Sequence, residues 1–411
     1  MYKESIYNCY VKSESGFLIF NSFSRAVIEV EDSAFVKNAL NKNNETDLDL
    51  LYKNGFIVNE STNEEGIMKY LYNKKYFNTE SQAIILMPTL KCNFNCPYCF
   101  EKGVSIDENK NYFDSIYKYI SINSNRFNKL YIGLFGGEPL LKSREIVSFL
   151  KKTKKLADKT NFQLYTSMVT NGSLLNSNFI DELTKFSCKY IQITFDGTRE
   201  RHNKSRVSSI GDPSFDLLIN NMECLASVSH SNAEFKAIMR INIENESVED
   251  VVTTLKAVNK KYRNDIHVLI RRVFNTCMYT TTSKKDCSIQ KYYEAANSLG
   301  YKSFKNRNLF SSCESCGDLN TVHILPDLSI YKCVNDLNYK GSKIGKLTDE
   351  GEMILDSKNL QMWYESANFF SDPKCSRCEK SASCMGGCIL HKRRTGRRNC
   401  SSIEHILGGY L

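Results

Sequence analysis

Apolar and polar positions follow two different periods along the middle of the chain. Short apolar runs, such as "AIILM" at 83–87, alternate with longer segments whose apolar residues recur every three to four positions. The first pattern predicts strands and the second predicts helices. Strands are expected in six segments: 81–91, 129–137, 162–172, 189–197, 234–243 and 265–273. A helix is expected after each strand: 107–123, 143–159, 176–186, 213–228, 246–262 and 287–299.

Six strand–helix units with mostly apolar strands predict a parallel sheet in an α/β protein. The number of units suits either an open doubly wound sheet or a partial (β/α)6 barrel. In both, chemistry belongs at the carboxyl ends of the strands. Four motifs fall at such ends: "CNFNCPYC" at 92–99, "GGEP" at 136–139, "TNG" at 170–172 and "FDG" at 195–197.

The two ends of the chain differ from the middle. Segment 1–80 reads as short strands followed by helices, a small α+β unit, and segment 305–411 is rich in cysteine. A chain of 411 residues suggests two or three domains. We therefore expect three: 1–80, 81–304 and 305–411.

Composition favours a soluble cytoplasmic protein. The chain is 41% hydrophobic and 25% charged, its N-terminus does not resemble a signal peptide, and its apolar runs are too short to span a bilayer. The cytosol keeps thiols reduced, so 16 cysteines indicate metal binding rather than disulfides. The net charge of +9 is modest, and no aromatic and basic platform for nucleic acid is visible. We expect neither a membrane nor a nucleic-acid partner.

The cysteines are unevenly spread. Cys188, Cys224, Cys277 and Cys287 have no ligand spacing and are expected to be small buried side chains. The remaining cysteines, apart from Cys9, form one group at 92–99 and another at 313–400. These two groups need a chemical explanation.

The first group has only three thiols, in the spacing C-x3-C-x2-C. A four-iron cluster held by three thiolates leaves one iron open, and an open metal position is where chemistry occurs. The open iron would accept a small chelating ligand. The "GGEP" segment is either a common turn or a close approach to that ligand, with Glu138 or backbone carbonyls holding an ammonium group.

These residues resemble the radical S-adenosylmethionine (SAM) enzymes, over about 85–300. Cys92, Cys96 and Cys99, with the aromatic Tyr98, match the family signature. The resemblance implies that these cysteines hold a [4Fe–4S] cluster, and that the methionine amine and carboxylate of SAM chelate the fourth iron.

The resemblance also implies cofactor contacts. Residues 136–139 would hold the methionine amino group, Thr194 and Asp196 the ribose, and Arg206 the carboxylate. Arg240 and Asn242 resemble pocket residues of the next strand. The full set of implied cofactor-binding residues is Tyr98, Gly136, Gly137, Glu138, Pro139, Asn171, Thr194, Asp196 and Arg206.

The second group holds eight cysteines, enough for two four-thiolate clusters or for zinc sites, and spacing alone does not decide between these. Their order resembles the SPASM extension, a twitch-type auxiliary iron–sulfur domain of some radical SAM enzymes. That resemblance implies two auxiliary [4Fe–4S] clusters, making three in all. One would use Cys333, Cys388, Cys316 and Cys313, and the other Cys375, Cys378, Cys384 and Cys400.

Two details of this pattern stay open. If only one of Cys313 and Cys316 binds, the first auxiliary cluster keeps an open iron. Leu328 stands where the SPASM pattern usually has glycine, so its turn must avoid positive φ or accept strain.

Segment 1–80 looks similar to PqqD-like winged-helix elements, which offer a strand edge to a leader peptide; a structural cap is the alternative. Together these resemblances imply a peptide maturase that cleaves SAM to a 5′-deoxyadenosyl radical and installs a thioether or carbon–carbon crosslink in a ribosomally made precursor peptide. An electron donor such as flavodoxin or ferredoxin is expected. The alternatives are an anaerobic sulfatase-maturing enzyme that makes formylglycine, and a non-catalytic iron–sulfur carrier or zinc-ribbon module. No general base can be identified from the sequence.

Overall fold

The computed structural model describes residues 1–13, 15–42, 44–273, 289–303, 317–318, 320–335, 337–398 and 400. The chain forms two compact units. The sheet unit comprises 78–304 and 319–360, and the terminal unit comprises 1–77, 305–318 and 361–411.

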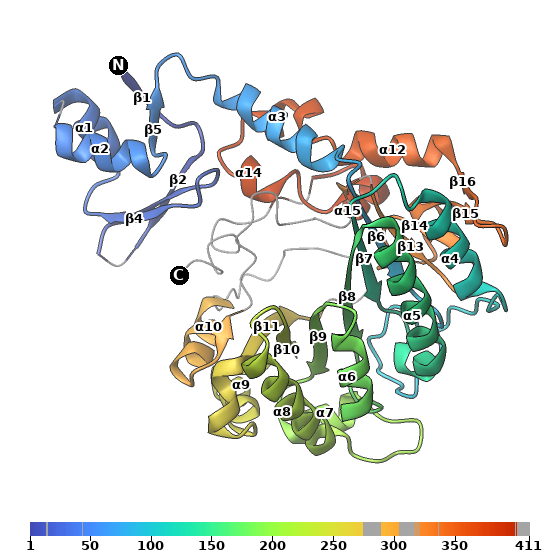
Figure 1. The fold of residues 1–411 in the computed structure, drawn as a ribbon. Coiled ribbons are helices and arrows are strands. Elements are labelled where there is room, and N and C mark those ends of the chain that lie inside the picture. Colours follow the sequence, from blue (N-terminus) through green and yellow to red (C-terminus); the bar gives the residue numbers. More distant parts are fainter. Residues whose placement is uncertain are drawn as a thin grey trace. The chain divides into compact units, whose positions relative to one another are not determined.

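The sheet unit is built on one sheet of eleven strands (Figure 1). The strand order is β12-β11-β10-β9-β8-β7-β6-β13-β14-β15-β16, parallel from β12 to β13 and antiparallel from there to β16. The sheet is open, with β12 and β16 at its edges. Its strands are β6 (Ser81–Leu86), β7 (Lys129–Leu134), β8 (Gln163–Thr170), β9 (Cys188–Phe195), β10 (Lys236–Ile243), β11 (Ile266–Arg272), β12 (Lys302–Ser303), β13 (Thr321–Ile324), β14 (Ser329–Tyr331), β15 (Lys343–Leu347) and β16 (Met353–Leu355).

The helices of this unit pack on one face of the sheet. Alternate strand residues, such as Ile132, Ile193 and Ile241, share one apolar core with them. A doubly wound sheet would carry helices on both faces. The helices are α4 (Tyr112–Asn123), α5 (Ser143–Thr160), α6 (Ser177–Thr184), α7 (Arg199–Ser205), α8 (Phe215–Ser231), α9 (Val248–Lys256) and α10 (Ile289–Ser298), with short 3-10 turns at η1 (Pro139–Lys142), η2 (Lys260–Asp265) and η3 (Lys340–Ser342).

The opposite face of β9 and β10 is polar. Thr194 lies beside Arg240 in the strand register, and Asn242 follows Arg240 at the next position on that face. Buried polar side chains need hydrogen-bond partners. This face is therefore where a polar ligand or a polar network can be accommodated.

The turn before β14 contains the departure noted from the SPASM pattern. Leu328 has φ +66° and is buried in the apolar core. A left-handed backbone costs about 1–2 kcal/mol for a residue with a Cβ atom. Of the two alternatives the turn accepts the strain, and burial of the leucine side chain offsets it.

The terminal unit joins segments from both ends of the chain. Its N-terminal part contains a meander of β2, β3 and β4, a β1–β5 pair and three helices, of which two precede β5 and one follows it. The N-terminal elements are β1 (Tyr2–Glu4), β2 (Asn8–Lys12), β3 (Phe17–Asn21), β4 (Val27–Val30), α1 (Phe35–Lys42), α2 (Glu45–Lys53), β5 (Ile57–Asn59) and α3 (Glu64–Tyr76). The C-terminal elements are α12 (Ser357–Ala367), η4 (Phe369–Ser371), α13 (Pro373–Ser376), α14 (Ser381–Cys384) and α15 (Ile389–Thr395).

Helix α3 connects the two ends. Its Tyr72 and Tyr76 pack with Phe369 and Met385 in one buried cluster, and Tyr76 donates a hydrogen bond to Met385 Sδ at 3.4 Å. The structure thus divides the chain differently from the three expected domains. The apolar face of α3 lies outside the cluster of β3, α1 and α2, and it packs both on Tyr7 of the N-terminal segment and on the C-terminal cysteine region.

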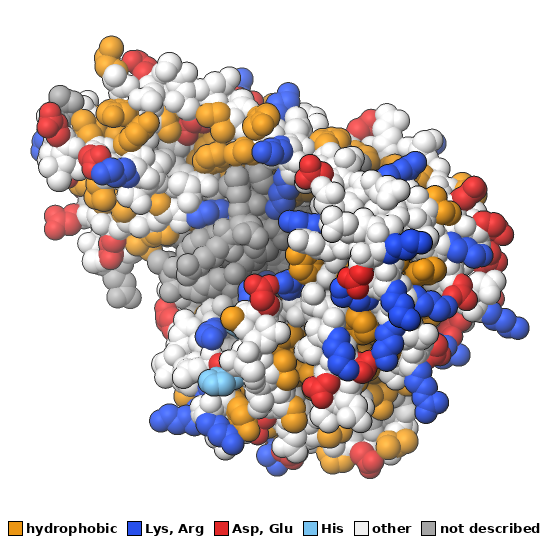
Figure 2. All heavy atoms as spheres, viewed as in Figure 1, with side chains coloured by type: hydrophobic (Ala, Val, Ile, Leu, Met, Phe, Trp, Pro, Cys, Tyr) orange, Lys and Arg blue, Asp and Glu red, His pale blue; other side chains and the backbone are white. Residues whose placement is uncertain are grey.

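Basic residues gather over α5 on the face shown in Figure 2. Several form ion pairs with nearby carboxylates, including Lys151 with Glu182 and Lys152 with Asp114. Exposed pairs of this kind are worth little individually. They account for part of the basic composition as a solvated helix surface.

The expected α/β class with a parallel sheet is confirmed. The SPASM assignment and the winged-helix description stay predictions. In the part of the chain that the structure describes, no helix is long and apolar enough to cross a membrane.

Candidate active site

The turns that follow β6, β7, β8 and β9 meet at one edge of the sheet, as parallel strands require. The cysteine loop follows β6, and residues 207–209 form hydrogen bonds with its backbone. Ser209 N–H donates to Asn93 C=O at 2.8 Å, and Asn95 N–H donates to Val207 C=O at 2.8 Å. The chain just after Arg206 therefore holds the cysteine loop in place.

Gly136 and Gly137 are required by the protein backbone itself. A Cβ atom on Gly137 would lie 2.2 Å from the carbonyl oxygen of Lys91, and one on Gly136 would lie 2.8 Å from that of Thr89. Gly137 N–H donates to Thr89 C=O at 3.1 Å. The glycines let this turn pack against the start of the cysteine loop, and the contact with the methionine amino group that the resemblance implies stays a prediction.

Glu138 ties the turn after β7 to the turn after β8. Its carboxylate is fully buried and accepts hydrogen bonds from Thr170 Oγ1 at 2.7 Å, Asn171 N–H at 2.8 Å and Leu140 N–H at 3.0 Å. Burial raises the pKa of the Glu138 carboxyl, and these donors oppose that rise. Pro139 begins η1 and is buried beside it.

Asn171 connects the turn after β8 to the first cysteine. Its Nδ2 donates to Asn93 Oδ1 at 2.8 Å and to Cys92 Sγ at 3.7 Å. Phe94 N–H also donates to Cys92 Sγ, at 3.4 Å. Burial raises the pKa of the Cys92 thiol to about 11. Two N–H donors aimed at one sulfur suit a metal-bound thiolate, because such hydrogen bonds stabilise negative charge on sulfur.

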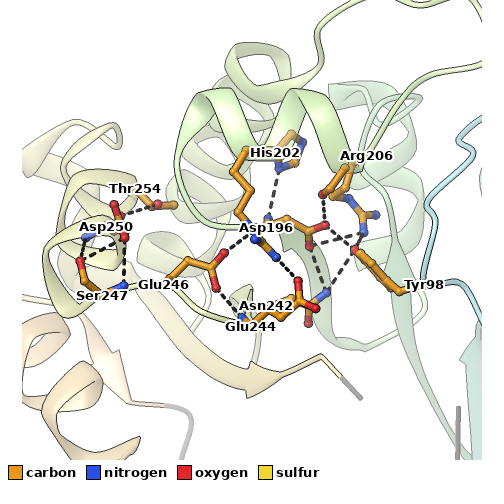
Figure 3. A network of polar contacts seen from close by, with 12 residues as sticks. Tyr98, Asp196, His202, Arg206, Asn242, Glu244, Glu246, Ser247, Asp250 and Thr254 are labelled. Atoms are coloured by element: carbon orange, nitrogen blue, oxygen red, sulfur yellow. Dashed lines mark hydrogen bonds and ion pairs between the residues drawn. The ribbon is translucent and has the colours of Figure 1, made fainter. Parts of the chain in front are cut away.

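Half-buried Tyr98 forms a network with buried Asp196 and Arg206 (Figure 3). Tyr98 donates to Asp196 Oδ2 at 2.5 Å, and Arg206 Nη1 donates to the Tyr98 hydroxyl at 2.9 Å. Asn242 Nδ2 donates to Asp196 Oδ1 at 3.1 Å, and Ser205 donates to Asp196 Oδ2. The structure thus brings together three residues that the sequence assigned to the cofactor.

Arg206 keeps part of its hydrogen-bonding capacity unused. Its Nε is buried and has no acceptor among the described residues. Burial lowers the pKa of the guanidinium, but Tyr98, Cys96 and Asp196 raise it more, so the side chain stays charged. A buried donor without an acceptor is costly, so the site fits an added anionic or carbonyl ligand at this atom.

His202, on α7, supports the network through a hydrogen bond with the backbone of Asp196. Its Nδ1 accepts a hydrogen bond from Asp196 N–H at 3.3 Å, so Nε2 carries the proton toward Ser214 Oγ at 3.1 Å. Burial, followed by the charge of Arg206, lowers the pKa of His202 to about 3. His202 was not predicted from the sequence, although it lies four residues before Arg206 on α7.

A second brace joins α7 to the loop after β10. Arg201 pairs with Glu244 at 3.0 Å and with Glu246, and Gly197, with φ +64°, packs against both Glu246 and Arg201. Figure 3 shows these carboxylates beside the network. The "FDG" turn is thereby held on the side away from the cysteine loop.

Thr194 and Glu101 also belong to this region. Thr194 lies on the polar face of β9, and its hydroxyl makes no hydrogen bond within the described chain. Glu101, two residues after Cys99, is 5% exposed, and neither carboxylate oxygen has a partner among described residues. Burial raises the pKa of Glu101 to about 8. The sequence offered no signal for Glu101 beyond its closeness to the cysteines.

Four C-terminal cysteines line one cavity of about 340 Å³ in the terminal unit. Its basic rim is formed by Lys374, Lys380 and Arg398, and Arg398 Nη2 donates to Asp372 at 2.8 Å. The loop beneath is held by the N-terminal meander, since Cys9 Sγ donates to Glu379 C=O at 3.4 Å. Cationic neighbours would compensate thiolate charge. The four cysteines are Cys375, Cys378, Cys384 and Cys400.

The other predicted ligands are less completely described. Cys333 is buried just after β14 in the sheet unit, and Cys388 caps α15 in the terminal unit. Cys313 and Cys316 lie outside the described residues. Among the described residues, no three or more His, Cys, Asp or Glu side chains converge on the position of a single metal ion.

Comparison with known proteins identifies the sheet unit. Residues 86–273 match the family model of the Radical SAM superfamily. The radical SAM cyclopropyl synthase TigE of Paramaledivibacter caminithermalis is 23% identical, over 93% of this chain and 88% of that protein. The cysteine-type anaerobic sulfatase-maturating enzyme of Clostridium perfringens is 23% identical, over 72% of this chain and 85% of that enzyme.

A solved structure is similar over nearly the whole chain. Streptococcus suis SuiB bound to its precursor peptide SuiA superposes with a TM-score of 0.50 at 15% identity, covering 96% of this chain and 97% of that one. SuiB has also been solved bound to S-adenosylmethionine. At this identity the likeness concerns the fold.

Proposed function

We propose that this radical SAM enzyme, with its radical SAM domain over 86–273, is a peptide maturase that installs an oxidative thioether or carbon–carbon crosslink in a ribosomally made peptide. One observation carries the proposal. The structural likeness to precursor-bound SuiB covers 96% of this chain, and by sequence TigE aligns with 93% of it, whereas the sulfatase-maturating enzyme aligns by sequence with 72%. The likeness to SuiB therefore extends into the N-terminal segment, the part expected to recognise a leader peptide.

The cysteine loop fits the first cluster. Cys92 receives N–H donors from Phe94 and Asn171, and the charge of Arg206 acts on both Cys96 and Cys99. Amide donors and a nearby cation stabilise thiolates. We assign Cys92, Cys96 and Cys99 as ligands of one [4Fe–4S] cluster.

The neighbouring residues fit SAM. Arg206 Nε is the free buried donor for its carboxylate, and Asp196 and Thr194 offer oxygen atoms to its ribose. When bound, SAM supplies on reduction a 5′-deoxyadenosyl radical that removes a hydrogen atom from the substrate. The protein's own part is to hold the Asp196–Tyr98 pair rigid through His202 and Asn242. The polar groups are thus already oriented before the ligand binds.

The cysteine-lined cavity supports an auxiliary cluster in the terminal unit. Its four thiols and basic rim suit a four-thiolate [4Fe–4S] cluster, and its ligand set is the second one that the SPASM pattern implies. For a further cluster, the ligand set Cys313, Cys316, Cys333 and Cys388 rests on the SPASM pattern of the sequence alone. These clusters would take the second electron when the peptide is oxidised, with flavodoxin or ferredoxin as the electron donor.

The leader peptide is assigned to the outer edge of β4. The hydrogen bond from Asn21 N–H to Ala26 C=O sets the phase of the β3–β4 ladder, so the N–H of Glu29 points away from β3. No described strand pairs with that edge. An unpaired edge accepts an extended peptide through main-chain hydrogen bonds. The precursor-bound structure of SuiB supports a peptide substrate.

Co-expression with a precursor peptide tests the proposal. Crosslinking without net addition removes two hydrogens, so the product should be lighter by roughly 2 Da. Glu29→Pro should reduce modification of the full precursor, while Glu29→Ala, which keeps the N–H, should not. Deleting 1–80 is less informative, because Tyr72 and Tyr76 also support the cysteine-lined cavity.

Sulfatase maturation is the second candidate, favoured by the likeness to the Clostridium perfringens enzyme. Its product carries an aldehyde that reacts with hydrazines. An unmodified precursor together with an aldehyde on a sulfatase peptide would replace the maturase proposal with this one.

A further inference from the structure

Two arginines lie on the polar face of the sheet beside the Tyr98–Asp196–Arg206 network. Arg240 is on β10, and Arg271 on β11 is the register partner of Asn242. Arg240 and Asn242 share a face because residues two apart on a strand do. The two arginine side chains therefore leave the sheet on the same side, at its carboxyl edge.

Hydrogen bonds link this pair to the network but leave most of its donors free. Arg240 Nε donates to Asn242 Oδ1 at 2.9 Å, and Arg271 Nη1 donates to the carbonyl oxygen of Ile270 at 3.0 Å. Within the described chain the Nη atoms of Arg240 have no acceptor, and no carboxylate forms an ion pair with either arginine. Burial, and next the charge of Arg271, lower the pKa of Arg240.

Charges in this region do not balance. Among the described residues, Arg206 Nη1 lies 4.0 Å from Asp196, whereas neither Arg240 nor Arg271 forms an ion pair. Uncompensated cations in a partly buried position are unfavourable. The site is therefore arranged for more than one added anionic group.

Arg206 and the Arg240–Arg271 pair have different neighbours. Arg206 donates to Tyr98 of the cysteine loop, and its charge acts on Cys96 and Cys99. A carboxylate chelated at the cluster would thus be a neighbour of Arg206. Arg240 instead donates to Asn242 of its own strand, and Arg271 lies on β11, one strand further from β9.

We propose that Arg240 and Arg271 bind a carboxylate of the peptide substrate, either an aspartate or glutamate side chain or the peptide's C-terminus, next to the residue that is modified. This inference rests on the proposed peptide-maturase function. The planar guanidinium fork matches a carboxylate with two parallel hydrogen bonds.

Binding of three short probes without reductant tests the inference. Ac-Gly-Glu-Gly-NH2 has only a side-chain carboxylate, Ac-Gly-Gln-Gly-OH only a terminal one, and Ac-Gly-Gln-Gly-NH2 neither. With SAM-loaded protein and ligand-observed NMR, one acidic probe should bind about tenfold or more tightly than the neutral probe, as a charge-assisted hydrogen bond predicts. The acidic probe that binds identifies the source of the carboxylate.

The double variant Arg240→Gln/Arg271→Gln should lose this preference. Arg271→Gln alone should weaken the preference and keep its affinity for SAM, because Arg271 is exposed and its hydrogen bond within the described chain is to the Ile270 carbonyl. The matched control is Arg126→Gln/Arg144→Gln, which changes two exposed arginines and should behave as wild type. If the double variant fails to retain iron, Arg271→Gln alone, at an exposed position, gives the same comparison with a smaller loss.

Two results would overturn the inference. Equal binding of all three probes by the wild-type protein would show that no carboxylate site exists. A tenfold loss of SAM affinity in Arg271→Gln would assign the pair to the cofactor, since one lost charge-assisted contact has about that effect. Failure of the maturase proposal is separate, because it is measured as absent precursor modification under reducing conditions.

Discussion

The cysteine loop at the edge of the sheet and the cysteine-lined cavity of the terminal unit obtain their support in different ways. The loop carries three cysteines within eight residues, 92–99, and its backbone is held by the turn after β7 and by residues 207–209. The cysteines of the cavity lie on α13, on α14, on the turn between them and at position 400. Helices α13 and α14 have four residues each. Helices this short are not stable alone.

We infer that the cysteine loop is supported by a fold that is stable without metal. The cysteine-lined cavity, in contrast, is formed by segments that depend on the metal for their own folding. Around the cysteine loop, Glu138, Asn171 and the two glycines make their contacts with protein atoms. Around the cavity, the apolar cluster beside the cysteines includes Tyr72 and Tyr76 of α3, which belongs to the N-terminal segment. Metal bound in the second setting contributes to folding, as in small metal-dependent domains.

The largest contrast is expected from removing ligands. Protein with three [4Fe–4S] clusters should carry about 12 irons, and Cys92, Cys96 and Cys99 changed together to Ala should leave about 8 with thermal unfolding little changed. Cys384→Ala should also leave about 8 irons but clearly lower the unfolding temperature, because the cavity folds around its metal. Anaerobic iron analysis and calorimetry measure both. Zinc in the cavity, or equal stability of the two variants, would contradict the comparison.

A substitution in the apolar cluster of Tyr72, Tyr76, Phe369 and Met385 should lower iron binding in the cavity and leave SAM cleavage unchanged. Tyr76→Ala removes a buried aromatic side chain and should cost about 3–5 kcal/mol in the terminal unit, with loss of iron from the cavity but continued SAM cleavage. Tyr70→Ala is the matched control, since Tyr70 lies on the same helix and is 64% exposed. Similar iron loss in both variants would argue against support of the cavity by Tyr76.

A single methyl group should disturb the loop. Gly137→Ala places a Cβ atom against the Lys91 carbonyl, so we expect a cost of about 1–3 kcal/mol and weaker SAM binding. Gly211→Ala, where no atom lies within 4 Å of the added Cβ, should keep wild-type SAM affinity despite its positive φ. Titration with SAM separates them, and an unaffected Gly137→Ala would show that the turn can move away.

The smallest effect concerns pH. Because the pKa of His202 falls from 6.5 to about 3 on folding, the unfolded chain binds one more proton between these values. Stability should therefore fall as the pH drops through that window, by up to about 1.4 kcal/mol per pH unit. His202→Gln should reduce the slope by one proton, measured by chemical denaturation at several pH values. An unchanged slope would mean that His202 does not titrate with folding.

The sequence predicted the parts of this molecule that depend on local pattern. The strand–helix alternation, and the motifs at the carboxyl ends of β6 to β9, followed from periodicity and from the rules for parallel sheets. The joining of α3 to Phe369 and Met385 did not, because residues about 300 positions apart leave no local signal of their contact. Nor did the packing of Gly137 against the Lys91 carbonyl, because the two residues are far apart in the sequence.

Partner choice within the site was also beyond the sequence. Asp196 and Arg206 were predicted as cofactor contacts, but their pairing with Tyr98, and the support from His202, depend on side-chain directions that only the folded sheet defines. At Leu328 the sequence indicated a conflict and left two outcomes, and the structure has the strained one.

The central claim is that the loop at 92–99 supports SAM chemistry, and product analysis tests it most directly. Reconstituted protein with a strong reductant should convert S-adenosylmethionine to 5′-deoxyadenosine and methionine in equal amounts. Cys96→Ala should form neither, because the cluster loses a ligand, while its auxiliary irons remain. Formation of 5′-deoxyadenosine by Cys96→Ala at the wild-type rate, or none by the iron-loaded wild-type protein, would contradict the account.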